Sequence, residues 1–258
     1  MTDARITPDP DRITRRDPAQ VAVPVSDLCR KPSGPRDRQL ICGDAVTILD
    51  ETGDWAYLQS DKDGYCGYLR RADLTGYSAP THRVSAPATH AYSRPDIKSP
   101  ESCSLSFASR LHVLTTTQGF AETPLGFVPI QHLSDITDVA HDPAAIAMLF
   151  LGTPYLWGGN SRWGIDCSGL VQAALLACGI PCPGDSDQQQ ALGQDASVPY
   201  RRNDLLFWKG HVALVTDAET MIHATAHPMA TVLEPIDAAI RRIANAGGGP
   251  VTAHRRLA

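Results

Sequence analysis

The chain has 258 residues, 43% of them hydrophobic, which is enough for two or three small domains with cores of their own. Its formal net charge is −5, so no basic surface for nucleic acid or anionic lipid is expected. No stretch approaches the roughly 18 consecutive apolar residues of a membrane helix. The polar first residues also lack the apolar core of a signal peptide. We therefore expect a cytoplasmic protein.

The seven cysteines show no CxxC spacing, and their number is odd. A disulfide framework is not indicated in a cytoplasmic protein. Cys178 and Cys182 lie close together in the sequence, but no second Cys or His pair accompanies them as a zinc site requires. We expect no metal and no cofactor.

The first half of the chain predicts short strands. Residues 1–20 are rich in Pro, Asp and Arg and predict an arm. Residues 21–76 contain strand-like runs at 46–49, 55–58 and 67–69, with turn signals between them and one closing turn at 71–74. Residues 84–135 resemble a weak copy of this unit, after a linker at 77–91. Two small, partly open barrels are predicted.

Residues 142–258 predict an α+β domain. A helix is expected at 143–150, with Asp142 as N-cap and Pro143 at the first helical position. A second helix runs from Cys167 to Cys178 on apolar spacing and ends at Gly179. Strands are expected at 204–208, 211–216, 220–223 and 251–255, and a helix at 238–244.

Cys167 is the candidate nucleophile because it stands where a helix begins. The unpaired N–H groups and the positive end of the helix dipole favour thiolate there, so a lowered thiol pKa is expected. The alternative is a structural cysteine on the buried face of that helix. The preceding Gly158-Gly159 favours the catalytic interpretation, because glycines let backbone and substrate approach closely.

His211 and His223 open and end two strand-like runs and are the candidate base and its orienting partner. His211 would take the thiol proton and later protonate the leaving amine, while His223 fixes its tautomer. Either residue alone is more often a satisfied core histidine. The oxyanion would be held by the backbone N–H of Cys167 and the phenol of Tyr155.

Five motifs together resemble the NlpC/P60 cysteine peptidases, papain-like hydrolases of bacterial cell-wall peptides. The resemblance implies Cys167, His211 and His223 as the catalytic triad. It departs at Asn203, where the family usually has glycine. The motifs are Thr153-Pro154-Tyr155-Leu156-Trp157-Gly158-Gly159, Asp166-Cys167-Ser168-Gly169-Leu170-Val171, Asp204-Leu205-Leu206-Phe207-Trp208, Gly210-His211-Val212-Ala213 and Ile222-His223-Ala224.

The two β units resemble bacterial SH3 domains, and the whole order resembles the γ-D-glutamyl-L-diamino acid endopeptidases of peptidoglycan recycling. The resemblance implies a papain-like catalytic domain after two SH3-like barrels. It also implies a murein peptide substrate, cleaved after L-Ala-γ-D-Glu when the alanine amine is free. The third stem residue is diaminopimelate or lysine. Neither nucleic acid nor membrane is an expected partner.

Binding of a free ammonium group in a closed subsite requires a carboxylate, since its desolvation is otherwise not offset. Asp185 and Ser186 match the position where the subfamily holds this amine, although Asp185 could instead cap a helix over 187–192. Tyr65 is predicted to close the same subsite, with a buried barrel tyrosine as the alternative. Trp157 would form one side of the pocket that holds D-Glu, and Ser168 would hydrogen-bond the α-carboxylate of D-Glu.

Three other functions stay open. The first is a hydrolase of intact peptidoglycan that uses its SH3-like units as wall anchors. The second is a cell-wall peptide-binding protein without catalysis. An acyltransferase with the same cysteine chemistry is the third.

Overall fold

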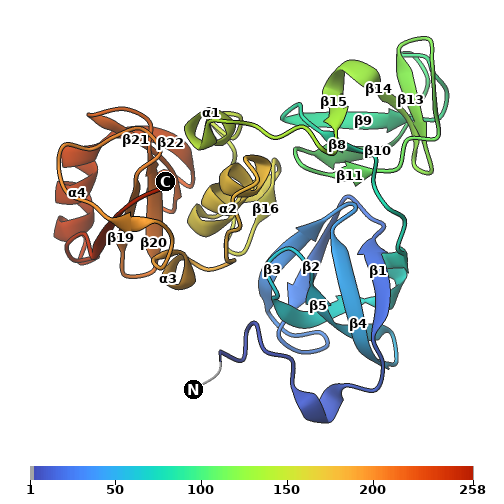
Figure 1. The fold of residues 1–258 in the computed structure, drawn as a ribbon, viewed down its shortest axis with the longest axis horizontal. Coiled ribbons are helices and arrows are strands. Elements are labelled where there is room, and N and C mark those ends of the chain that lie inside the picture. The colour runs from blue at the N-terminus through green and yellow to red at the C-terminus, as the bar shows by residue number, and fades with distance from the viewer. Residues whose placement is uncertain (1–2, 258) are drawn as a thin grey trace. The chain divides into compact units, whose positions relative to one another are not determined.

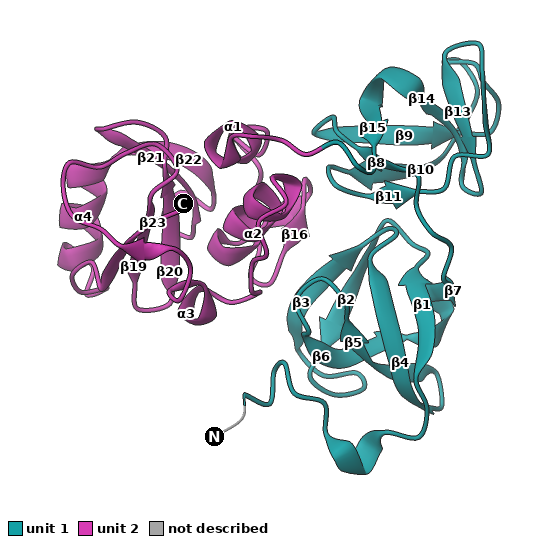
Figure 2. Cartoon of the chain, in the orientation of Figure 1, with its two compact units in different colours: residues 1–138 teal, residues 139–258 magenta. Residues whose placement is uncertain are grey.

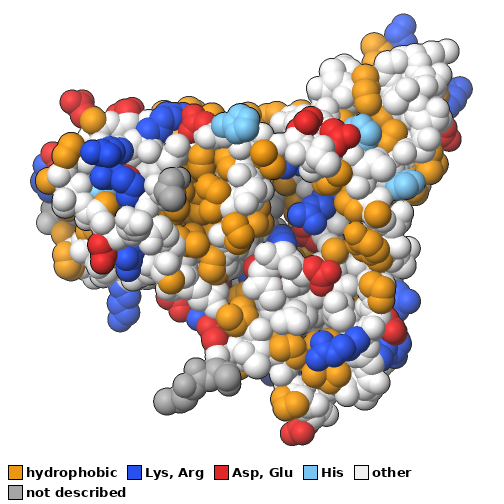
Figure 3. Space-filling view, in the orientation of Figure 1, with side chains coloured by type: hydrophobic (Ala, Val, Ile, Leu, Met, Phe, Trp, Pro, Cys, Tyr) orange, Lys and Arg blue, Asp and Glu red, His pale blue; other side chains and the backbone are white. Residues whose placement is uncertain are grey.

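The computed structural model describes residues 3–257. The chain divides into two compact units, one up to Asp138 and one from Val139 onward (Figure 2). Across residues 3–257, no helix combines the length and the apolar character that crossing a bilayer requires. Acidic and basic side chains are interspersed on the face drawn in Figure 3, and no continuous basic patch is visible there.

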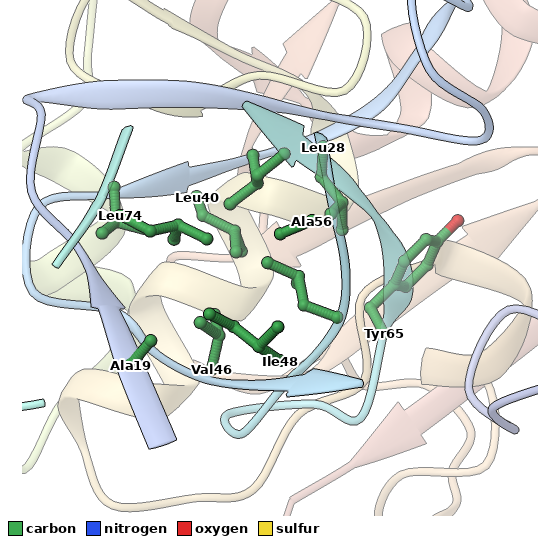
Figure 4. Close-up of a cluster of buried hydrophobic side chains, with 11 residues drawn as sticks. Ala19, Leu28, Leu40, Val46, Ile48, Ala56, Tyr65 and Leu74 are labelled. Carbon is green, nitrogen blue, oxygen red and sulfur yellow. The ribbon is translucent and has the colours of Figure 1, made fainter. Parts of the chain in front are cut away.

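The first unit begins with an antiparallel sheet in the order β3-β2-β6-β5-β4-β1-β7. Alternate residues of its strands point inward and form an aliphatic core with Leu28, Leu40 and Val46 fully buried (Figure 4). The predicted arm is shorter than expected, because Asp17 already pairs with Ile48. The elements are η1 (Pro10–Arg12), β1 (Asp17–Val21), β2 (Val25–Cys29), β3 (Arg36–Ile41), β4 (Ala45–Thr52), β5 (Trp55–Ser60), β6 (Cys66–Arg70), η2 (Arg71–Asp73) and β7 (Leu74–Gly76).

The rest of the first unit consists of two small antiparallel sheets, in the orders β10-β9-β14-β13-β12 and β11-β8-β15. The predicted linker at 77–91 is wrong in part, because strands β8 and β9 start within it. The assignment of this segment as a second SH3-like barrel stays a prediction. The elements are β8 (His82–Val84), β9 (Ala88–Tyr92), β10 (Glu101–Ser106), β11 (Arg110–Leu111), β12 (Thr115–Thr117), β13 (Phe120–Thr123), β14 (Gly126–Pro129), η3 (Ile130–His132) and β15 (Leu133–Asp135).

The second unit places helix α2 and helix α4 on opposite sides of a sheet in the order β18-β23-β19-β20-β21-β22 (Figure 1). The predicted helices and strands occur in the expected order, and strand β22 is an element that the sequence pattern did not predict. The helices are α1 (Pro143–Met148), α2 (Cys167–Ala177), α3 (Ser186–Gln189) and α4 (Ile236–Asn245). The strands are β16 (Asn160–Ser161), β17 (Gly164–Ile165), β18 (Gln194–Asp195), β19 (Leu205–Trp208), β20 (His211–Val215), β21 (Thr220–Thr225), β22 (Ala230–Pro235) and β23 (Ala253–Arg256).

The structure explains why asparagine is tolerated at position 203, where the NlpC/P60 family usually has glycine. Its φ is +72°, in the left-handed region that asparagine tolerates better than most residues. Its side-chain oxygen also accepts a hydrogen bond of 2.8 Å from the backbone N–H of Ala144, at the start of α1. The substitution therefore keeps the turn and adds a tether to a neighbouring helix.

Asp204 holds the last strand, β23, against the sheet. Its carboxylate is 1% exposed and accepts hydrogen bonds from Arg256, at 2.8 Å and 2.7 Å, and from the backbone N–H of Arg201 at 2.9 Å. His254 Nε2 lies 2.7 Å from the same carboxylate. A buried carboxylate is stable only with such a set of partners.

We expect Asp204→Ala to lower the free energy of unfolding by about 3–5 kcal/mol, because it leaves a guanidinium without its partner. The measurement is urea denaturation of the full chain. Asp195→Ala is the matched control, since Asp195 pairs with the neighbouring Arg255 at 2.7 Å but is 91% exposed. The control should change stability little, because solvent screens exposed ion pairs. Equal losses in both variants would contradict the assignment of Asp204 as the anchor.

Candidate active site

Asp166 starts helix α2 and fixes the geometry of the residue that follows it. Its Oδ1 accepts the backbone N–H of Gly169 at 2.7 Å, which is an N-cap hydrogen bond. Its Oδ2 accepts the backbone N–H of Gly158 at 2.8 Å. One carboxylate therefore caps the helix and ties the preceding glycine turn to it, with Cys167 between the two contacts.

The glycines on either side of Cys167 occupy positions where the backbone disfavours a side chain. Gly158 has a φ of +70°. A Cβ on Gly159 would lie 2.5 Å from the carbonyl oxygen of Gly164, and one on Gly169 would lie 2.5 Å from that of Gly159. The turn, the β16–β17 hairpin and the first turn of α2 therefore approach one another closely at Gly159 and Gly169. The positive φ accounts for Gly158 and the close packing for Gly159, and substrate approach at this turn stays a prediction.

The Cys167 sulfur lies at the start of strand β20. The backbone N–H groups of Val212, Ser168 and Cys167 itself lie close to the sulfur and act to lower the pKa of the thiol. Val212 directly follows His211, so the sulfur lies next to the backbone of the candidate base. The residue is buried, with 7% of its surface exposed.

The two histidines belong to a longer chain of contacts across neighbouring strands. His211 Nε2 lies 2.9 Å from His223 Nδ1. His223 is 0% exposed, and its Nε2 lies 3.0 Å from Glu234 Oε2 on β22. Arg242 on helix α4 donates to both oxygens of Glu234, at 2.8 Å and 2.6 Å. Every nitrogen of the buried His223 ring therefore has a partner.

Burial decides the charge state of this site. It raises the pKa of the Cys167 thiol to about 12, and the charge of Asp166 adds to the effect. It also lowers the pKa of His211 to about 3 and of His223 to about 4. At neutral pH the site therefore holds a thiol and two neutral imidazoles. The expectation of a lowered thiol pKa is wrong here, because desolvation outweighs the three backbone N–H donors at the sulfur.

Tyr155 lies near Cys167 and Asp166, whose charges act on its phenol. Burial raises the pKa of its phenol to about 12, with further contributions from the charges of Cys167 and Asp166. The phenol therefore stays protonated and can donate a hydrogen bond. Its backbone N–H donates to the carbonyl of Met229 at 2.9 Å, which anchors this segment beside β22.

Asp185 and Ser186 stand at the start of the short helix α3. Asp185 occupies the N-cap position, but its side chain makes no capping hydrogen bond. The buried Gln189 donates to the backbone carbonyls of Ser168 and Pro183, both at 3.0 Å, which holds α3 against the first turn of α2. The predicted amine-binding pair thus lies in a segment tied to the residue after Cys167.

The other residues predicted to bind substrate differ in their exposure and in the contacts that they already make. The Ser168 hydroxyl donates to Asp166 Oδ1 at 3.1 Å, so in this structure it serves the helix cap. Trp157 is 68% exposed. Tyr65 belongs to the first unit, where it is 3% exposed and Arg38 lies over its ring at 5.4 Å. Its ring lies at the edge of the aliphatic core (Figure 4). The substrate roles of these residues stay predictions.

Sequence reasoning missed Glu234 and Arg242. Glu234 lies on β22, whose burial does not alternate cleanly because Leu233 is exposed. The available signal was the β-branched run Thr231-Val232 before Pro235. In residues 3–257, no group of three or more His, Cys, Asp or Glu side chains could hold a metal ion.

Known proteins resemble this chain in both units. The model of the NlpC/P60 family matches residues 152–239, and that of the bacterial dipeptidyl-peptidase SH3 domain matches residues 28–74. A gamma-D-glutamyl-L-lysine dipeptidyl-peptidase of Bacillus subtilis is 29% identical over 217 residues, covering 72% of this chain and 71% of the relative. A Bacillus cereus protein of the same name is 28% identical over 238 residues, covering 78% and 71%.

A crystal structure of an NlpC/P60 family protein from Bacillus cereus gives a TM-score of 0.77 at 22% identity, over 93% of this chain and 99% of that one. At this identity the likeness supports the fold alone. The papain-like arrangement within the second unit stays a prediction. The NlpC/P60 match spans Cys167, His211 and His223, and the SH3 match spans strands β3 to β6. The chain therefore carries an NlpC/P60 domain and, before it, a bacterial SH3 domain.

Proposed function

We propose that this chain is a cysteine peptidase that hydrolyses the bond between γ-D-Glu and the diamino acid of murein peptides, as in peptidoglycan recycling. The contact of 2.9 Å between His211 and His223, next to the buried thiol of Cys167, is the observation that carries the proposal. The NlpC/P60 match and the names of the two Bacillus relatives support a peptidase of this type.

The neutral pair of thiol and imidazole calls for general-base catalysis. As the sulfur attacks the carbonyl carbon, the S–H proton passes to His211 and a C–S bond forms. The carbonyl oxygen becomes an oxyanion, for which the Cys167 N–H and the Tyr155 hydroxyl are the candidate donors. The C–N bond then breaks as His211 returns the proton to the leaving amine. Water hydrolyses the thioester, with His211 again as base.

If the site binds the free N-terminal amine of the substrate, the cleaved bond always follows the second residue. The enzyme would then be a dipeptidyl-peptidase. Asp185 supplies the carboxylate that a desolvated ammonium needs. The tether from Gln189 to the Ser168 carbonyl supports this assignment, since it connects the Asp185 segment to the catalytic helix. The competing function is hydrolysis of intact peptidoglycan, where the amine is not free.

We expect Cys167→Ala to lower kcat by at least about 10⁴-fold while the protein stays folded. Removing one sulfur from the core should cost at most a few kcal/mol of stability. The assay is release of L-Ala-D-Glu from L-Ala-γ-D-Glu-diamino acid peptides, followed by mass spectrometry. Cys178→Ala, at the other end of α2, is the matched control and should keep full activity. Turnover by the Cys167 variant would end the peptidase proposal.

Alkylation by iodoacetamide tests the charge state of the site. Because the pKa of Cys167 is raised to about 12, its thiolate fraction should grow about tenfold per pH unit. The rate of modification of Cys167 should therefore rise steadily from pH 6 to pH 9. Peptide mass spectrometry separates it from the other six cysteines. A rate that is already constant below pH 7 would instead indicate a preformed thiolate–imidazolium pair.

Asp185→Ala should reduce kcat/KM on free-amine peptides by roughly 2–5 kcal/mol of transition-state binding. The neighbouring Asp187→Ala, an exposed carboxylate on the same helix, serves as the control and should change little. Wild type is expected to spare N-acetylated peptides and intact sacculi, whereas the Asp185 variant should lose the preference for the free amine. An unchanged preference would show that the amine is bound elsewhere.

A further inference from the structure

We propose that Glu234, held by Arg242, is a positioning residue that fixes the tautomers of both imidazoles and so leaves His211 Nδ1 without a proton, ready to accept one from the thiol. This inference deepens the proposed function and rests on it. It adds a carboxylate to the far end of the two-histidine arrangement, where neither imidazole alone determines the direction of the hydrogen bonds.

The strand register brings Glu234 to the buried ring. Strands β21 and β22 pair antiparallel with His223 opposite Val232, so Glu234 is two residues farther along β22 and faces the same side of the sheet. Diagonal neighbours of this kind are within reach of long side chains. The contact of 3.0 Å between His223 Nε2 and Glu234 Oε2 follows from this register.

Glu234 is a carboxylate and therefore only accepts hydrogen bonds. The hydrogen bonds from Arg242 hold the pKa of Glu234 below its usual range, and the contact with His223 contributes in the same direction. Since the carboxylate has no proton to give, the proton of the 3.0 Å contact must lie on His223 Nε2.

The positions of the other ring protons of His223 and His211 then follow from this assignment. A neutral His223 with its proton on Nε2 has a lone pair on Nδ1. The contact of 2.9 Å between that Nδ1 and His211 Nε2 therefore needs the proton on His211 Nε2. His211 is also neutral, since burial lowers its pKa to about 3, so its Nδ1 carries a lone pair. This is the atom that a general base for the thiol requires.

Without an acceptor at position 234 this order is lost and can reverse. Arg242 would then have lost its carboxylate partner at this end of the arrangement, and a guanidinium only donates. A donor facing His223 Nε2 favours a lone pair there and a proton on Nδ1. That proton would point at His211 Nε2, which would then have to accept it, and His211 would carry its own proton on Nδ1. A base in that tautomer cannot accept the S–H proton.

Two variants of equal length separate the acceptor from the charge and the packing. Glu234→Gln removes the charge but can keep an amide oxygen toward His223 and Arg242. Glu234→Met removes both the charge and the acceptor. Asp142→Asn is the control elsewhere in the second unit, because it disrupts an arginine–carboxylate pair, with Arg202 at 2.7 Å, that touches neither imidazole.

Long-range ¹H–¹⁵N NMR of the full chain without substrate reads the tautomers directly. Substitutions of single histidines assign the two rings among the nine histidines. We expect protons on Nε2 of both His211 and His223 in the wild type, in Glu234→Gln and in the control. In Glu234→Met, a signal for His211 with its proton on Nδ1 should appear. Wild-type His211 protonated on Nδ1, or a Glu234→Met spectrum like the wild type, would overturn the inference.

Kinetics supply the second readout. In Glu234→Met, kcat should fall by roughly 10²-fold or more with KM nearly unchanged, because a wrong tautomer removes the base and not the binding site. Glu234→Gln should retain kcat within about tenfold. Equal losses in the two variants would indicate a charge or packing role and overturn the proposal. The NMR experiment needs no turnover, so a failure of the peptidase assignment would be distinguished from a failure of this inference.

Discussion

Complete burial of the His223 ring is the constraint on which the rest of the second unit depends. A buried imidazole has two nitrogens, and each needs a partner because an unpaired buried polar group costs about 1–3 kcal/mol. His211 and Glu234 supply the two partners from strands on either side. Strands β20, β21 and β22 must therefore keep their order and register, and helix α4 must place Arg242 on Glu234. The same contacts therefore hold the sheet in register and arrange the side chains of the candidate site.

Two opposing effects meet at the Cys167 sulfur. The helix start and three backbone N–H groups stabilise a thiolate, while removal from water destabilises it. In the closed site the second effect is larger, and the pKa of the thiol is raised to about 12. The imidazole beside it responds to burial in the opposite direction and stays neutral. This balance favours the thiol over the thiolate, so the proposed attack by the sulfur would depend on an oriented base.

Local sequence signals predicted the elements that carry the cysteine and the histidines. Asp166 before an apolar helical run marks the start of α2, and β-branched runs mark β20 and β21. The linker and the arm were placed less well, because short strands with polar residues, such as β8, carry little periodicity. Strand β22 was not predicted from the sequence for a related physical reason, since it lies at the edge of the sheet with Leu233 exposed. Its Glu234 contacts a residue eleven positions away in the sequence and a helix beyond it, and no local pattern reports such contacts.

The charges of Glu234 and Arg242 act on the pKa of His211 in opposite directions, which helps a carboxylate lie near a neutral imidazole. Glu234 raises the pKa of His211, whereas Arg242 lowers it. In our proposal the ion pair fixes the hydrogen-bond direction, while Arg242 opposes the effect of the Glu234 charge on the pKa of His211. A lone buried carboxylate would instead hold a proton on the ring and make it a poor acceptor. Placing the anion one ring away from His211, and neutralising it with Arg242, keeps the directional effect of a carboxylate while leaving the base free of charge.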